Sequence, residues 1–259
     1  MTEPLERPGE KLGEGTLLSH LAELRSRLLK VAASVILVFI GLLPFAQKIF
    51  EFVSEPLRDV LPGGQMIATA VASPLLAPFK LTFYIALFIA MPVVLYQTWA
   101  FVAPGLYKKE KRFALPLLAS SVVLFYAGIA FAYYVVFPLI FGFMTAIAPE
   151  GVEVMTDVTA YLDFIMMLVL AFGLAFEVPI AAVLIVWTGL STVEKLAKAR
   201  PYVFLGAFVV GMFLTPPDVI SQTLLAVPVY LLYELGIIMA RLFARSSSDS
   251  AEEATATEV

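Results

Sequence analysis

The sequence predicts an all-α integral membrane protein with six transmembrane helices in a bent, concave bundle. Its composition is 61% hydrophobic and 15% charged, with a mean hydropathy of +0.92, whereas a soluble domain is about 45–50% apolar and about 25% charged. Polar stretches separate six apolar segments, at residues 28–45, 79–102, 113–143, 161–187, 202–214 and 222–243. Lysine and arginine gather in alternate connecting stretches, as they do in multi-pass membrane proteins.

Length and charge together decide how many segments cross the membrane. A crossing helix needs about 20 residues, which the first four segments reach and the fifth, 202–214, does not. Of the 17 Lys and Arg residues, 14 lie in the N-terminal segment, the second and fourth loops and the C-terminal end. The other three loops hold only Lys48, Arg58 and Lys80. We therefore expect both termini in the cytoplasm, which requires the fifth segment to cross despite its length.

Outside the predicted spans, we expect disordered ends of the chain and two helices that lie on the membrane surface. We expect one membrane domain at residues 17–243, between a disordered N-terminus at 1–16 and a disordered tail at 244–259, which lack an apolar pattern. The stretch "TLLSHLAELRSRLLKVAA" predicts an amphipathic helix that lies on the surface before the first span. In the first outside loop, "IFEFVSEPL" predicts a second interfacial helix, ended by Pro56.

Five prolines fall inside the apolar segments, and each removes a backbone donor and bends its helix. So many predict a concave bundle more than a tight cylinder, with plain kinks of no functional role as the alternative. The positions are Pro92, Pro116, Pro138, Pro179 and Pro228.

Glu177 is a single carboxylate within the fourth apolar segment. An ionised side chain at the bilayer centre costs roughly 2.5–3.5 kcal/mol, so Glu177 must face protein or water, or be protonated. Gly173 and Ala181 lie four residues to either side, so the wall around the carboxylate is narrow. Two interpretations remain open: an interhelical hydrogen bond, or a polar position in a cavity. Gln222, at the start of the sixth segment, is a candidate partner.

Two further acids lie on the side expected to be cytoplasmic. Glu23 is four residues before Arg27, the spacing of a surface ion pair worth about 0.3–0.5 kcal/mol, so an incoming cation displaces Arg27 at little cost. Glu110 lies among four bases in "YKKEKRF", where composition alone predicts an ordinary solvated charge. Spacing alone does not join the two acids.

Long motifs resemble those of one known family. "HLAELRSRLL", "MIATAVASP", "LYQTWAFVAPGLYKKEKR", "FGLAFEVP" and "RPYVFLGAFVVGMFLTPPDVISQTLLAVP" are similar to TatC, the polytopic subunit of the twin-arginine protein translocase, over roughly residues 17–243. The resemblance implies a glove-shaped bundle with two short final helices in the bacterial cytoplasmic membrane. It also implies a receptor for Arg-Arg signal peptides that works with TatA and TatB, self-associates, and uses the proton-motive force to export folded proteins.

The resemblance also assigns residues. It implies that Glu23 and Glu110 receive the two arginines, for which carboxylates suit forked guanidinium bonding. Supporting positions would be Arg25, Pro56, Phe101 and Asp218, while Glu177 and Gln222 would line an intramembrane polar cavity.

Other function classes remain to be compared. The family has no enzymatic activity or cofactor, and the sequence lacks a nucleotide-binding loop and an H-E-x-x-H signature. No cysteine is present, His20 is the one histidine, and a net charge of −4 is too small to imply nucleic-acid binding. The alternatives are an ion-coupled transporter using Glu177, although no paired repeat is seen, and a structural membrane scaffold.

Overall fold

The computed structural model describes residues 10–60, 67–102, 111–147, 157–214 and 219–257. Within these ranges the regular structure is helical, apart from one isolated bridge between Ile67 and Asp157. The helices are α1 (Glu10–Leu42), η1 (Leu43–Phe45), α2 (Ala46–Val60), α3 (Ser73–Val102), α5 (Lys111–Phe131), a π-helical turn η2 (Ala132–Val136), α6 (Phe137–Ile147), α7 (Val158–Ala175), α8 (Val178–Trp187), α9 (Val193–Lys198), α10 (Arg200–Leu214) and α11 (Val219–Thr257).

Membrane-spanning length confirms the predicted class. Five helical segments of the described chain are long and apolar enough to cross a bilayer: Ser19–Ser54, Ser73–Phe101, Leu115–Ile140, Val158–Trp187 and Val219–Phe243. The remaining apolar helix, α10, corresponds to the fifth apolar segment and has 15 residues, or about 22 Å at 1.5 Å per residue, against a hydrocarbon core of about 30 Å. The short fifth helix is therefore as expected, whereas α11 is not short: it has 39 residues.

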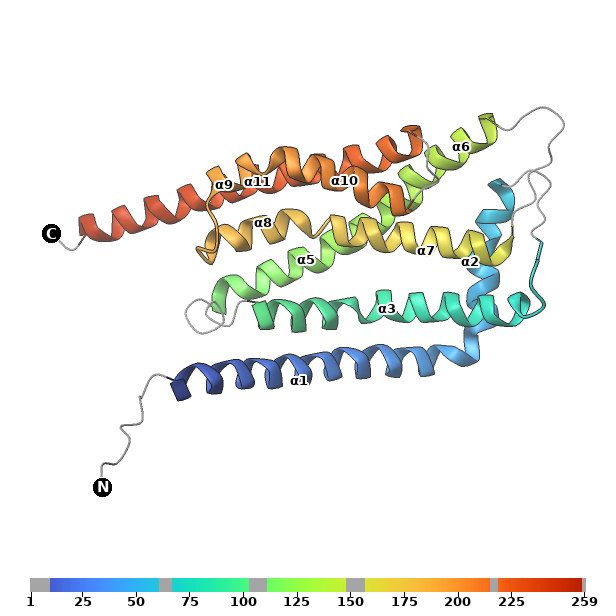
Figure 1. Ribbon diagram of the computed structural model, residues 1–259, viewed down its shortest axis with the longest axis horizontal. Coiled ribbons are helices and arrows are strands. Elements are labelled where there is room, and N and C mark those ends of the chain that lie inside the picture. The colour runs from blue at the N-terminus through green and yellow to red at the C-terminus, as the bar shows by residue number, and fades with distance from the viewer. Residues whose placement is uncertain (1–9, 61–66, 103–110, 148–156, 215–218, 258–259) are drawn as a thin grey trace, which may run out of the picture.

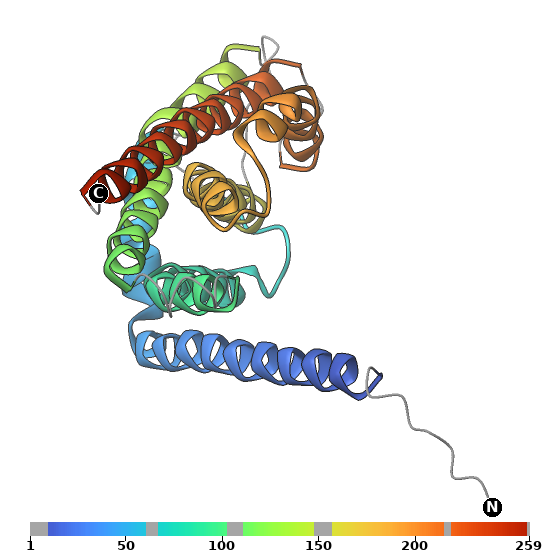
Figure 2. The ribbon, with the colours of Figure 1, turned by 90° about the vertical axis from the view of Figure 1, so that its left-hand side faces the viewer.

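The long helices run side by side and alternate in direction (Figure 1). As a result, α1 begins and α11 ends at the same end of the molecule, which also holds the start of α5, α9 and the start of α10. We call it the basic end, because it carries Arg25, Arg27, Lys30, Lys195, Lys198, Arg200 and Arg241. Viewed end-on, α1, α3, α5 and α11 follow a curved line, with α7 and α8 on its inner side (Figure 2).

Several expected boundaries are corrected by the structure. No bend separates the amphipathic stretch from the first span, because α1 runs unbroken from Glu10 to Leu42. The amphipathic α2 continues through Pro56 to Val60, since a proline can bend a helix without ending it. The helices α1 and α11 include residues 10–16 and 244–257, where the alanine and glutamate of the C-terminal stretch are good helix formers; the membrane domain at residues 17–243 between disordered ends stays a prediction.

The two ends of α7 are fixed by different means. At its start, Asp157 Oδ1 accepts from the amides of Thr159 and Ala160 (2.9 Å each), while Oδ2 accepts from the amide (2.9 Å) and hydroxyl (2.6 Å) of Thr69. These hydrogen bonds, that from the Thr69 hydroxyl foremost, lower the pKa of Asp157 to about 2. The carboxylate thus joins the two loops at the α2 end. At the other end of α7 the helix breaks before α8, at Glu177.

Candidate functional site

Glu23 lies on the face of α1 that packs against α3. Its Oε1 accepts two hydrogen bonds from Arg27, from Nε (3.0 Å) and Nη2 (2.6 Å). Arg27 Nη1 donates in turn to Oε1 of Gln97 on α3 (3.3 Å). The Glu23 side chain is 40% exposed, and Oε2 accepts no hydrogen bond from the residues that the structure describes. The predicted ion pair is present, and it leaves one carboxylate oxygen available.

An aromatic stack closes the gap between α1 and α3 next to this pair. The rings of His20 and Phe101 are stacked, with centroids 4.5 Å apart and an angle of 22° between planes. Phe101 is the penultimate residue of α3, so it brings the end of that helix to the first turns of α1. The stack and the ion pair together make a half-exposed polar and aromatic surface at the basic end.

The other residues predicted to assist Glu23 are placed differently. Glu110 and Asp218 lie outside the described residues, although Lys111, which follows Glu110, begins α5 at the basic end. Pro56 lies within α2, which is at the opposite end of the molecule from the basic end. Arg25 is exposed and, two residues from Glu23, projects from the opposite side of α1. The structure therefore brings Phe101 to Glu23 and turns Arg25 away.

Glu177 lies in a hydrogen-bonded chain that links three membrane helices. Trp99 Nε1 on α3 donates to Ser121 Oγ on α5 (3.0 Å), and Ser121 Oγ donates to Glu177 Oε2. Glu177 is 8% exposed, and its Oε1 has no hydrogen-bond partner among the described residues. Of the two interpretations from sequence, the interhelical hydrogen bond is present here. The sequence analysis did not identify Ser121 and Trp99 as members of this hydrogen-bonded chain. The signal that could have found them is a polar group inside an apolar segment, here the indole N–H of Trp99 and the hydroxyl of Ser121.

Among the described residues, Gln222 is hydrogen-bonded to a different helix from Glu177. Its Nε2 donates to the carbonyl of Phe208 on α10 (2.7 Å), and its side chain packs beside Gly211, where an added Cβ would lie 3.1 Å from Gln222 Cγ. Gln222 thus joins α11 to α10, and the two predicted cavity residues bond to different helices.

Two further polar contacts were not anticipated. Lys80 on α3 forms an ion pair with Asp163 on α7, with both side chains more than two-fifths exposed. At the basic end, Arg200 Nη2 donates to Glu234 Oε2 (2.8 Å), and Tyr230 donates to Glu234 Oε1 (2.9 Å). The contact between Arg200 and Glu234 ties the start of α10 to α11.

Within the described ranges no group of three or more His, Cys, Asp or Glu side chains is arranged to hold a metal ion.

Comparison with known proteins decides the family. The family model described as Sec-independent protein translocase protein (TatC) matches residues 19–228. The chain belongs to the TatC family. The TatC protein of Azotobacter chroococcum is 63% identical over 222 residues, covering 85% of this chain and 87% of that protein. The TatC protein of Escherichia coli K12 is 57% identical over 228 residues, 88% of each.

A solved structure agrees with this assignment. A crystal structure of the twin-arginine translocase receptor TatC matches with a TM-score of 0.78 and 37% identity, covering 86% of this chain and 98% of that one. The resemblance seen in the motifs is thereby confirmed. This TatC-family chain is a multi-pass, all-α membrane component of the Sec-independent twin-arginine translocase.

Proposed function

We propose that this chain is the signal-peptide receptor of its translocase and that Glu23 and Glu110 bind the two arginines of the signal. The observation that carries the proposal is Glu23 itself. It is a half-exposed carboxylate at the end of the bundle, with Oε2 available and Oε1 held by an intrahelical Arg27. An arginine of the signal peptide can bind Glu23 Oε2 directly. Alternatively, it can replace Arg27 at Oε1, because Arg27 would still have its hydrogen bond to Gln97.

The chemistry favours arginine over lysine at such a site. A guanidinium donates two parallel hydrogen bonds to a carboxylate, while an ammonium acts as a point charge. Phe101 offers an aromatic face beside Glu23, and guanidinium groups also stack on such faces. One carboxylate serves one arginine, so a pair of arginines needs a second acid. Glu110, directly before α5 at the basic end, supplies it.

Orientation follows from the charge distribution. The basic end carries most of the Lys and Arg residues, so we place it in the cytoplasm of a bacterial inner membrane, with both termini on that side. Signal peptides then reach Glu23 from the cytoplasm. Single-span partners of the TatA and TatB type would dock against the membrane helices and, with the proton-motive force, support export of folded proteins.

Glu177 has a proposed role in that docking. It lies at the break between α7 and α8, buried, with one carboxylate oxygen lacking a partner. A partner helix or signal hairpin that displaced the neighbouring side chains would find an acceptor there, and Gln222 would offer a second polar group on α11. The transporter and scaffold hypotheses gain no comparable observation.

The experiment that tests the receptor proposal measures binding of an Arg-Arg signal peptide to the purified chain. We expect Glu23→Ala or Glu110→Ala to weaken binding about five- to 150-fold, as the loss of one charge-assisted contact predicts. The double variant should bind more weakly than either single variant, but less than additively, because both acids serve one dipeptide. A Lys-Lys peptide should bind the unmodified chain poorly.

Glu194→Ala is the matched control. Glu194 is an exposed acid at the same end, in the first turn of α9, so its removal changes the net charge equally without touching the proposed site. Wild-type affinity in the Glu23→Ala/Glu110→Ala variant, or an equal loss in Glu194→Ala, would contradict the proposal.

A further inference from the structure

The outer face of α1, away from α3, carries a shallow open hollow of about 480 Å³ at the basic end. Ala22, Ser26, Leu29 and Ala33 recur every three or four residues, so they form one line along the helix, and three of the four are small. At about 100° per residue, Arg25 projects about 60° to one side of Ala22 and Lys30 about 80° to the other. The hollow therefore has a floor of mostly small residues between two cations.

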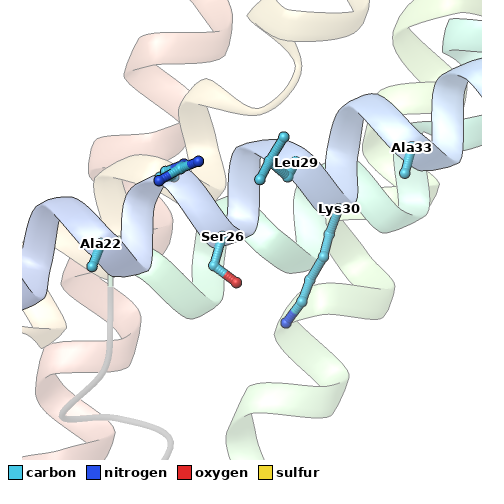
Figure 3. Close-up of a pocket in the computed structure, with 6 residues that line it drawn as sticks. Ala22, Ser26, Leu29, Lys30 and Ala33 are labelled. Carbon is cyan, nitrogen blue, oxygen red and sulfur yellow. The ribbon is translucent and has the colours of Figure 1, made fainter.

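Figure 3 shows how the labelled side chains lie. Ser26 and Lys30 point to the same side of α1, and the lysine is directed back toward the N-terminal end of the helix. A lysine near the end of a membrane helix adopts this direction when its ammonium reaches for the headgroup region. A hydroxyl and an ammonium thus face one space beside the floor.

The two cations are not used by the protein itself. Arg27, at the same level of α1, is bonded to Glu23 and Gln97. By contrast, Arg25 and Lys30 make no hydrogen bond or ion pair with the part of the chain that the structure describes, and both are exposed. Two unpaired cations on either side of a hydroxyl form a site for an anion.

The position of the hollow indicates which anion. The first apolar segment begins at residue 28, so Arg25 lies just before it and Lys30 lies in its first turn, from which a lysine side chain reaches the headgroup region. Along the same face toward the α2 end, Ile36, Leu37 and Ile40 are 55%, 75% and 60% exposed. An anion bound between the cations therefore has an apolar helix face directly below it, as a phospholipid with its acyl chains requires.

We propose that this face of α1 is a binding site for an anionic phospholipid of the cytoplasmic leaflet. The phosphate lies between Arg25 and Lys30 and accepts from Ser26, and the acyl chains run along Ile36, Leu37 and Ile40. The site is separate from Glu23, which is on the other side of the helix. Basic residues near the membrane surface attract anionic lipid by about 1 kcal/mol each, so two of them give a preference of about 10- to 30-fold.

Native mass spectrometry of the full-length chain in detergent tests the site, with phosphatidylglycerol and phosphatidylcholine added separately. We expect wild type to retain phosphatidylglycerol in preference to phosphatidylcholine. Arg25→Gln/Lys30→Gln should lose about 10- to 30-fold in apparent affinity for phosphatidylglycerol and little for phosphatidylcholine. Ser26→Leu keeps both charges, but it removes the hydroxyl and places a larger side chain in the hollow. It should therefore also weaken phosphatidylglycerol binding.

Matched variants separate the site from general charge and bulk. Lys195→Gln/Lys198→Gln removes two exposed cations from the same end, and Ala119→Leu adds the same kind of side chain on an exposed part of α5; both should retain the lipid. Equal phosphatidylglycerol binding by wild type and Arg25→Gln/Lys30→Gln would overturn the proposal. So would equal loss in the Lys195→Gln/Lys198→Gln control, or a change of oligomeric state in place of lipid loss, which would make this face a contact between chains.

Discussion

Ser121 is the residue on which the environment of Glu177 depends. It is fully buried, and it accepts from Trp99 while donating to Glu177. Without the hydroxyl, the Glu177 carboxyl would lose its hydrogen bond in this structure, and the Trp99 N–H would lose its acceptor. A buried polar group left without a partner costs about 1–3 kcal/mol.

We therefore expect Ser121→Ala to lower the free energy of unfolding by about 1–3 kcal/mol, measured by denaturant or thermal unfolding in detergent. Ser120→Ala is the control, because Ser120 is exposed and donates only to the Pro116 carbonyl of its own helix (2.9 Å); it should change stability by less than about 0.5 kcal/mol. Equal stability of the two variants would mean that the Trp99–Ser121–Glu177 chain contributes nothing.

At this scale the sequence revealed local contacts and missed distant ones. The Glu23–Arg27 pair was predictable because the partners are four residues apart on one helix. The Ser121 partner of Glu177 is 56 residues away, and Gln222, the candidate partner from sequence, donates to Phe208 in this structure; polarity alone does not indicate which helices meet. Arg25 shows a further limit: motif membership grouped it with Glu23, while helical register puts the two on opposite sides.

At the scale of elements, α5 and α7 approach closely because glycines meet aromatic residues there. A Cβ added at Gly128 would lie 2.5 Å from the carbonyl oxygen of Phe172, and one at Gly173 would lie 2.6 Å from the ring of Phe125. The obstacle at Gly128 is backbone, which cannot move without displacing α7. This contact holds the central pass, which contains Glu177, against the curved outer row of helices.

Gly128→Ala should therefore destabilise the protein by about 1–3 kcal/mol, the usual cost of overpacking. Gly206→Ala is the comparison, because a Cβ there meets no described atom within 4 Å, and alanine is the better helix former by about 1 kcal/mol. We expect unfolding experiments to find Gly206→Ala as stable as wild type or more so. Tolerance of Gly128→Ala would show that α5 and α7 can separate at little cost.

Apolar pattern and proline positions predicted the elements better than their ends. The six apolar helices follow from runs of apolar residues, and α10 is short as its run predicted. The π-helical turn at Ala132–Val136 and the break at Glu177 depend on packing between helices, which no local pattern encodes. The continuation of α2 through Pro56 likewise reflects tertiary packing of its apolar face on α3.

At the scale of the whole molecule, an even number of passes puts both ends of the chain together. The alternation of direction from α1 to α11 is what gathers the start of α1, the end of α3, the start of α5, and α9 at the basic end (Figure 1). Because Lys and Arg are so unevenly distributed between the two ends, we expect the basic end to face the cytoplasm. Glu23 and the proposed lipid site then lie on one side of the membrane, facing opposite sides of α1.

Cysteine labelling in intact cells tests this orientation, and the chain has no native cysteine to interfere. Lys48→Cys lies on exposed α2 at one end, and Lys195→Cys on exposed α9 at the other. An impermeant maleimide should label Lys48→Cys in intact cells and Lys195→Cys only after the inner membrane is permeabilised. Labelling of both sites from outside would require an even number of crossings between them, so one of the three passes through α3, α5–α6 and α7–α8 would have been misassigned. Labelling of Lys195→Cys alone would invert the protein and put Glu23 on the side that signal peptides do not reach.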